Sequence, residues 1–386
     1  MGAEVLAHLA LDLVGMETRL TYPASLRLIR AARRDSSLVI TRLDENPAWH
    51  EDAPSCTDIN DALLAWPGES HALRDGAKLF VLVPREGDRS RSRRLCYRIC
   101  EKGLPARSFV AVSRPGFPLM VTESPELCVI RAAADLTLKV RQGALDKNAA
   151  LVRLVELIDE LCGRYVRHPS SPRDEPLAYD LEPITSVDRL ARYLQGVRRV
   201  NGTPFARQAL HYAIDNLGSP MEALLEMACC LPPHLGGINL PKPVSNQPLD
   251  FSRHERTLVS HISLRPDLYW EKYRIAGEYN GHDHDDKDAS DEDDRRVSDY
   301  QACSIKVFPA RYRNVSSGRG LDEHLRKLID AMAVVEGPRW GQRVRATLAS
   351  STYQQARQVL LDTMLPPRPR HGQRDATITE SMSAKS

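Results

Sequence analysis

Two carboxylates, Asp267 and Glu278, are spaced in the sequence so that they could share one metal ion. The flanking segments, 264–270 and 273–279, are rich in aromatic and β-branched residues, as strands are, and the polar pair at 271–272 indicates a turn. A turn centred between positions 272 and 273 puts Asp267 directly opposite Glu278, where Cβ atoms lie about 4.5 to 5.5 Å apart. The sequence therefore predicts a β-hairpin that carries a paired-carboxylate site for a hard cation such as Mg²⁺ or Mn²⁺.

Alternation along the second strand brings a third polar group to this place. Glu278 and Asn280 fall on one face of the hairpin, and Ile275, Gly277 and Tyr279 fall on the other. We therefore expect Asp267, Glu278 and Asn280 to form one polar cluster. A hairpin with one solvated face shows the same alternation without any chemistry, so a plain surface role stays open.

The motif has three parts, namely Pro266-Asp267, the eleven-residue step to Glu278, and the run Glu278-Tyr279-Asn280-Gly281. Together they resemble the PD-(D/E)xK nuclease superfamily, in the branch of the very-short-patch-repair endonucleases. The resemblance implies an α/β, restriction-endonuclease-like C-terminal domain with a small mixed sheet flanked by helices. It also implies hydrolysis of DNA phosphodiester bonds with Mg²⁺ or Mn²⁺ held by Asp267 and Glu278, in phage defence or DNA repair.

Asn280 departs from the family pattern, in which Glu-x-Asp-Gly or Glu-x-Lys is common. An amide oxygen can bind a hard cation, but it adds no charge and cannot take a proton from water. The alternative to an endonuclease is therefore a weakly active or inactive nucleic-acid-binding regulator with the same fold. A protein-interaction adaptor is a third class.

Glu222 corresponds to the catalytic glutamate that the family carries on its first helix, which would begin here at Ser219. The same residues also have a purely structural explanation. Ser219 as N-cap, Pro220 at the first helical position and Glu222 three residues after the cap form a capping box. Both roles stay open for Glu222.

The resemblance also implies a second helix near 290–302, with Arg295 or Arg296 matching a family arginine, and a closing strand at 304–308. His284 would be a general acid or base, because imidazole titrates near neutrality. However, residues 282–294 include eight acidic residues among thirteen, which is typical of a solvated loop. That negative charge opposes the approach of phosphates unless divalent cations screen it.

Basic residues near the hairpin motif are candidates for holding a nucleic-acid backbone. Most of them decorate two predicted helices just before the nuclease-like region, where a solvated surface is the alternative explanation. The candidates are Arg192, Arg198, Arg199, Arg207 and Arg296.

The chain of 386 residues is long enough for two or three domains. We predict helices over 124–139, 148–162, 321–335 and 340–364, and strands over 37–41 and 78–83. The predicted units are an α+β accessory domain over 1–166, a linker over 167–180, the nuclease-like domain over 181–325, packing helices over 326–364, and a disordered tail over 365–386.

The runs SPELCVIRAAADL and LIDELCGRY in the first unit resemble the C-terminal part of the type IV abortive-infection antitoxin family, which implies a DNA-binding regulator. A net charge of +2 carries no global nucleic-acid signature, so any such surface is local. The expected partner is DNA, and a homodimer or a toxin–antitoxin or defence partner protein stays open. We expect no membrane span and a cytoplasmic location, because no apolar run is long enough to cross a bilayer and the eight cysteines form no CxxC pair.

Overall fold

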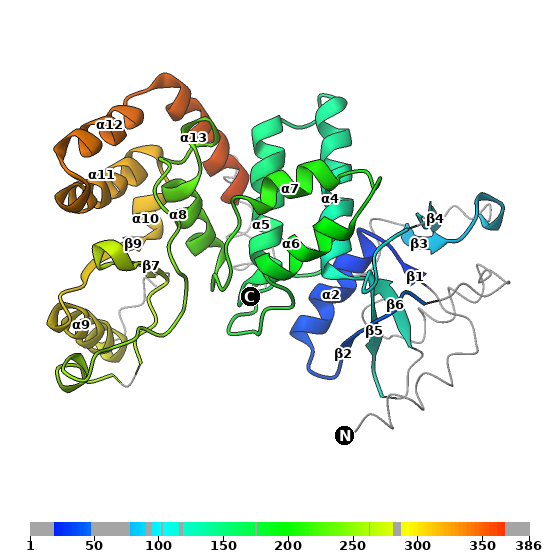
Figure 1. The fold of residues 1–386 in the computed structure, drawn as a ribbon, viewed down its shortest axis with the longest axis horizontal. Coiled ribbons are helices and arrows are strands. Elements are labelled where there is room, and N and C mark those ends of the chain that lie inside the picture. The colour runs from blue at the N-terminus through cyan, green and yellow to red at the C-terminus, as the bar shows by residue number, and fades with distance from the viewer. Residues whose placement is uncertain are drawn as a thin grey trace, which may run out of the picture.

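The computed structural model describes residues 19–47 and 78–366, except 90–94, 102, 116–118, 171, 174–175, 262 and 281–286. The chain is a mixed α/β protein. A six-stranded sheet, a central group of helices and a three-stranded sheet follow one another across the molecule (Figure 1). The predicted general acid or base, His284, lies outside the described residues, as does the predicted disordered tail from residue 367 on.

The N-terminal sheet is mixed, with strand order β2-β5-β6-β1-β3-β4. Helix α2 (Ala24–Arg34) packs on it through Leu28, which shares a core cluster with Val81 and Val112. The predicted strands at 37–41 and 78–83 are confirmed as β2 and β3. The strands are β1 (Arg19–Leu20), β2 (Val39–Arg42), β3 (Leu79–Val83), β4 (Leu95–Ile99), β5 (Phe109–Ser113) and β6 (Met120–Glu123).

Helices α4 (Pro125–Arg141) and α5 (Lys147–Cys162) confirm the two predicted helices of the first unit. Ser124 caps α4 by accepting a hydrogen bond from the Leu127 amide at 3.3 Å. Helix α5 ends at Gly163, where a Cβ atom would lie 2.5 Å from the Asp159 carbonyl oxygen, so only glycine fits there. The helices that follow are α6 (Val187–Gly196), α7 (Thr203–Leu210) and α8 (Pro220–Cys230).

The C-terminal helices are α10 (Tyr312–Val315), α11 (Gly318–Glu336), α12 (Pro338–Leu348) and α13 (Ser351–Met364). Helix α13 packs against α5 and α8, and α11 and α12 pack against α13 (Figure 1). The prediction of one helix over 340–364 is wrong. The helix is interrupted at 349–350 because Ser350 leaves the helical conformation and acts as the N-cap of α13. Its side-chain oxygen accepts a hydrogen bond from the Tyr353 amide at 3.5 Å.

One hydrophobic cluster joins the central and C-terminal helices, with Leu154 of α5, Leu224 of α8 and Leu360 of α13 among its buried members. Helices on both sides of the predicted linker at 167–180 therefore share a core. The linker is itself tied down, because its Pro176 carbonyl oxygen accepts from Arg34 Nη1 of α2 at 3.0 Å. Within the described part of the chain, no helix combines the length and the apolar character that crossing a membrane requires.

Buried ion pairs fasten the N-terminal sheet to the helices. Arg131 of α4 is 2% exposed and donates to Glu123 of β6 at 2.8 Å and to Glu101 at 2.5 and 2.6 Å. Arg30 of α2 makes a two-pronged pair with Glu160 of α5 at 2.8 and 2.6 Å. Buried pairs of this kind matter most when one partner is removed, since the other is then left as an uncompensated charge.

The three-stranded sheet holds the predicted hairpin. Its order is β7-β8-β9, with β7 (Leu268–Trp270) antiparallel and β9 (Lys306–Arg311) parallel to β8 (Ile275–Asn280). Helix α9 (Lys287–Ala302), which leads into β9, confirms the predicted second helix. One face of the sheet packs against α9 through Tyr269 and Ala276, and the other joins the main core through Leu268 and Ile275.

Two predicted strand boundaries are corrected. The first strand is shorter than 264–270, because residues 264–266 pair instead with the preceding segment, as in the bond from the Asn246 amide to the Pro266 carbonyl oxygen at 3.0 Å. The closing strand begins and ends later than 304–308. Ser304 has φ +56°, so the chain turns there before β9 begins.

Candidate active site

The hairpin register confirms the predicted pairing of the two carboxylates. Leu268 pairs with Gly277 and Trp270 with Ile275, so the next step outward puts Asp267 opposite Glu278. The turn is a short 3₁₀ segment over 271–273, closed by Arg274 in the left-handed region at φ +49°. A slip of one residue would have sent the two carboxylates to opposite faces of the sheet.

Glu278 is 8% exposed and is held from α9. Tyr300 donates its hydroxyl to Glu278 Oε1 at 2.6 Å, and Arg296 Nη2 lies 3.3 Å from both carboxylate oxygens. Burial, then the Glu278 charge, raises the pKa of Tyr300, so its hydroxyl keeps the proton that it donates. Arg296 and Tyr300 lie one helical turn apart, which lets both reach the same carboxylate.

Asp267 lies at the start of β7, where its Oδ2 accepts a hydrogen bond from the Tyr279 amide at 2.6 Å. Burial, followed by the negative charges of Glu222 and Glu278, raises the pKa of Asp267 to about 8. Three acidic side chains therefore lie in a poorly solvated place, and Arg296 only partly offsets their effect on Asp267. Such a place favours a bound cation, or failing that a proton.

Glu222 lies in the first turn of α8, and its charge acts on Asp267. Its amide donates to Ser219 Oγ at 3.1 Å, which confirms Ser219 as the N-cap. The reciprocal bond of the predicted capping box is displaced by one residue, since Glu222 Oε2 accepts from the Gly218 amide at 2.7 Å, and also from Asn246 Nδ2 at 2.7 Å. Burial raises the pKa of Glu222 despite these donors, so the capping role does not isolate Glu222 from the acidic cluster.

Asn280 and Arg311 share the rim of the site. Asn280 follows Glu278 by two residues on the same face of β8, as predicted. The parallel ladder then places Arg311 of β9 directly beside Asn280, and Arg311 is exposed. A guanidinium therefore lies at the end of the sheet where the polar cluster opens to solvent.

The metal hypothesis rests on the donor set. Among the described residues, no group of three or more His, Cys, Asp and Glu side chains is arranged so that it could hold a metal ion. Mg²⁺, however, keeps several waters and needs only one or two carboxylates together with substrate phosphates. The oxygens of Asp267 and Glu278, with the excess negative charge around them, fit that requirement.

Of the predicted nucleic-acid-binding arginines, the structure brings Arg296 to the carboxylates. The other four lie on or just after α6 and on α7, which pack against α4 in the central group of helices, apart from β7 and α9 (Figure 1). Arg207 donates to the Leu194 carbonyl oxygen at 2.7 Å, and Arg192 pairs with Asp188 at 2.7 Å. Arg198 and Arg199 are exposed in the loop between the two helices.

Sequence reasoning missed Tyr300, Asn246 and Arg311. The spacing of four between Arg296 and Tyr300 on a predicted helix was a usable signal for Tyr300. Arg311 lies beyond the predicted end of the closing strand, and its place depends on a parallel register that one sequence does not reveal. Asn246 lies in irregular chain far from Glu222 in sequence, and no local pattern marks it.

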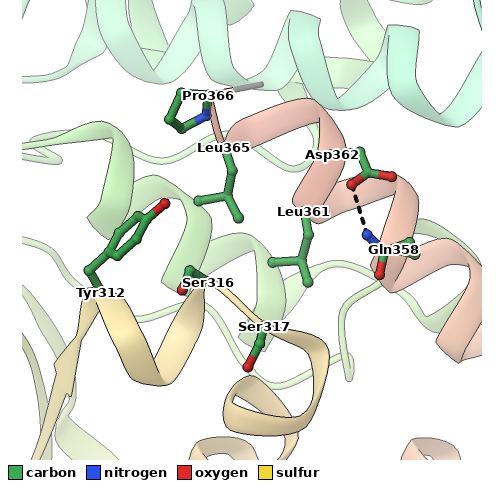
Figure 2. Close-up of a pocket in the computed structure, with 8 residues that line it drawn as sticks. All are labelled: Tyr312, Ser316, Ser317, Gln358, Leu361, Asp362, Leu365 and Pro366. Atoms are coloured by element: carbon green, nitrogen blue, oxygen red, sulfur yellow. Dashed lines mark hydrogen bonds between the residues drawn. The ribbon is translucent and has the colours of Figure 1, made fainter. Parts of the chain in front are cut away.

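The hollow between α10 and α13 has a volume of about 560 Å³ and is separate from this cluster. Figure 2 shows Leu361 and Leu365 beside Tyr312, with Gln358 Nε2 donating to Asp362 at 2.8 Å. Asp362 is the one charged residue among those that line it. The lining contains none of the predicted site residues, so we interpret it as a packing gap between helices.

A second buried acidic pair lies one turn further along α8. Glu226 is fully buried, and neither of its oxygens accepts a hydrogen bond within the described structure. The nearby Cys230 thiol donates to the Pro241 carbonyl oxygen instead. Asp159 of α5 is also fully buried, and only its Oδ1 is bonded, to the Ile214 amide at 3.1 Å.

These two acids predict a pH-dependent stability. Burial raises the pKa of Glu226 to about 7, with Lys242 opposing the shift, and burial followed by the Glu226 charge raises that of Asp159. A carboxyl group whose pKa is raised on folding stabilises the protein fully below its unfolded pKa of about 4.3, and this stability is lost as pH rises through 7. Between pH 4.5 and 8, ionisation of Glu226 should lower the free energy of unfolding of the wild type by about 2 kcal/mol. We expect Glu226→Gln to lack this decrease.

Urea denaturation across this pH range measures the difference in the free energy of unfolding between the wild type and Glu226→Gln. Glu271→Gln, an exposed acid in the hairpin turn, is the control and should track the wild type. Parallel profiles for the wild type and Glu226→Gln would show that Glu226 is not protonated by burial.

Comparison of the chain with models of protein families, with curated proteins and with solved structures gives no match. The functional assignment is therefore argued from the residues and geometry of the site.

Proposed function

We propose that the protein is a divalent-metal-dependent endonuclease-like hydrolase that cleaves phosphodiester bonds in DNA, with a restriction-endonuclease-like arrangement around β7, β8 and α9. The observation that carries the proposal is the convergence of Asp267 and Glu278 across the hairpin, where burial and then the charges of Glu222 and Glu278 raise the pKa of Asp267 to about 8. Acids with strongly raised pKa values that gather at one place are characteristic of functional sites.

Each residue of the cluster has a chemical task in this proposal. Asp267 and Glu278 would hold the cation, whose chemistry would be to polarise the phosphate and to lower the pKa of a water. Tyr300 and Arg296 orient Glu278 through the hydrogen bonds at 2.6 and 3.3 Å. Asn280 orients the attacking water through its amide, and a neighbouring acid such as Glu222 accepts the proton, since its raised pKa makes it a better base than an ordinary carboxylate.

A second candidate function is a nucleic-acid-binding regulator that does not cleave. The Arg296 ion pair favours it, because a guanidinium at 3.3 Å partly neutralises Glu278 and lowers its affinity for a cation. Asn280 adds no charge to restore that affinity. The two candidates therefore differ in metal binding first and in cleavage second.

Calorimetric titration with Mg²⁺ and Mn²⁺, followed by incubation with supercoiled plasmid, tests the proposal. We expect the wild type to bind metal and nick the plasmid, and Glu278→Gln to lose both. Glu271→Gln removes an exposed acid from the same hairpin and should behave as the wild type. Absence of metal binding and nicking in the wild type would favour the regulator.

Arg311 offers a separate prediction. It is exposed beside Asn280, so it can hold a DNA phosphate next to the one being cleaved. We expect Arg311→Ala to weaken DNA binding in Ca²⁺ and to reduce the slope of log affinity against log salt by about 1. Arg313→Ala removes an exposed charge two residues further on, in α10, and should leave the slope unchanged. Equal slopes for Arg311→Ala and the wild type would remove Arg311 from the DNA path.

A further inference from the structure

A hollow of about 430 Å³ lies where the N-terminal sheet meets α6, away from the carboxylate cluster. Its volume falls within the about 300 to 1,000 Å³ that is usual for small-molecule sites. Four guanidinium groups from three separate segments meet there. These groups belong to Arg42, Arg107, Arg189 and Arg192.

The charge of this hollow is positive once its internal pairs are counted. Arg42 makes a two-pronged pair with Glu126 at 2.9 and 3.0 Å, which leaves both neutralised. Asp44 is paired with Arg107 at 2.9 Å, but both side chains are exposed, so the pair is weak and a phosphate can compete with Asp44 for Arg107. Within the described residues, the exposed Arg189 guanidinium has no hydrogen-bond or ion-pair partner. Arg192 adds a further positive charge, which is partly offset by its exposed pair with Asp188.

Apolar residues that are fixed by packing also line the hollow. Pro105 lies against Gly196 of α6, where a Cβ atom would be 3.4 Å from the proline ring. Tyr193 is 9% exposed, and its hydroxyl is fixed to Ser108 Oγ at 2.7 Å. A lining that combines arginines with packed apolar residues suits a ligand that has an anionic end and a flat, weakly polar body.

Arg107 occupies an unfavourable backbone conformation to reach this place. Its φ is +65°, in the left-handed region that costs a non-glycine residue about 1 kcal/mol or more. A glycine would relieve that strain, but it would remove the guanidinium from the hollow. Strain retained by a residue that lines a cavity is the pattern expected of a binding site.

We propose that this hollow binds a nucleoside monophosphate unit, with its phosphate on Arg189 and Arg107 and its base against Pro105 and Tyr193. The unit can be a free nucleotide or an unpaired nucleotide of a DNA or RNA strand, since both carry the same phosphate and base. This site is independent of the metal-dependent hydrolase proposed above, because it uses none of its residues.

Calorimetry on the full chain in EDTA tests the proposal, because removal of divalent cations silences the carboxylate cluster. The probes are dAMP, AMP, inorganic phosphate, and single-stranded 8-mers of DNA and RNA. We expect a nucleotide or strand to bind more tightly than inorganic phosphate, with affinity falling as salt rises. Arg189→Ala and Arg107→Gly should each weaken that binding by about tenfold or more, as loss of a charge-assisted hydrogen bond does.

Arg107→Gly separates binding from folding, since relief of the left-handed strain should keep its melting temperature at or above that of the wild type. Arg153→Ala is the matched control, because Arg153 is an exposed arginine that lines a different hollow. Binding of dAMP or AMP would identify a free nucleotide as ligand, and binding of an 8-mer alone would identify a strand. Absence of binding by every nucleotide and strand, or unchanged binding in both variants, would overturn the proposal.

Discussion

Asp267→Asn should abolish metal-dependent DNA cleavage, by at least about 100-fold, while making the metal-free protein more stable at neutral pH. Cleavage is lost because the amide removes a charge from the pair of metal ligands. Stability rises because burial and the charges of Glu222 and Glu278 hold the pKa of Asp267 at about 8, so the wild type must take up a proton, or accept an unfavourable buried charge, on folding at pH 7. We expect a gain of about 1 to 3 kcal/mol.

The pH dependence gives the sign of this effect. A raised carboxyl pKa means that the contribution of Asp267 to stability is fully present below its unfolded pKa of about 3.9 and is lost as pH rises through 8. The advantage of Asp267→Asn should therefore grow steadily from pH 4 to pH 8 in urea titrations. Mg²⁺ should raise the melting temperature of the wild type and leave that of the variant unchanged. A variant that is less stable than the wild type at pH 8 would contradict the electrostatic account.

Arg131→Met should destabilise the protein by about 3 to 5 kcal/mol. Arg131 is 2% exposed and compensates two acids, of which Glu123 is fully buried. After the substitution, the Glu123 carboxylate keeps the Tyr22 amide as a donor at 2.9 Å, but it loses the Arg131 guanidinium that contacts it at 2.8 Å. Urea denaturation at pH 7 measures the loss.

Two companion variants identify the cause of that loss. Arg192→Met breaks an exposed pair with Asp188 and should change stability by about 0.5 kcal/mol or less. Adding Glu123→Gln to Arg131→Met should recover part of the stability, because it removes the stranded charge. No recovery in the double variant would mean that packing of the arginine side chain, and not its charge, accounts for the effect.

Local patterns in the sequence predicted much of the candidate site. Aromatic and β-branched runs around a polar turn were enough to place Asp267 opposite Glu278, and Ser219 with Pro220 was enough to start α8. These features depend on neighbours within about a dozen residues, where strand periodicity and capping chemistry act directly.

Features that depend on long-range contacts were not predicted. The pairing of Glu226 with Asp159 joins two helices 67 residues apart, and the meeting of Arg189 with Arg107 depends on how α6 packs against the N-terminal sheet. The break at 349–350 was missed for a different reason, since the run of serines there competes for backbone hydrogen bonds without interrupting the apolar pattern. The endonuclease assignment itself stays a proposal.

Pro309 has a consequence for self-association. It lies in β9, an outer strand of the three-stranded sheet, opposite Glu278 of β8. A proline has no N–H group to donate, and in a strand it is tolerated where that group would point away from the sheet. The free border of β9 is thus interrupted at its middle, which discourages another chain from extending the sheet there and protects against aggregation by that route. We therefore do not expect a homodimer to form by strand addition at β9.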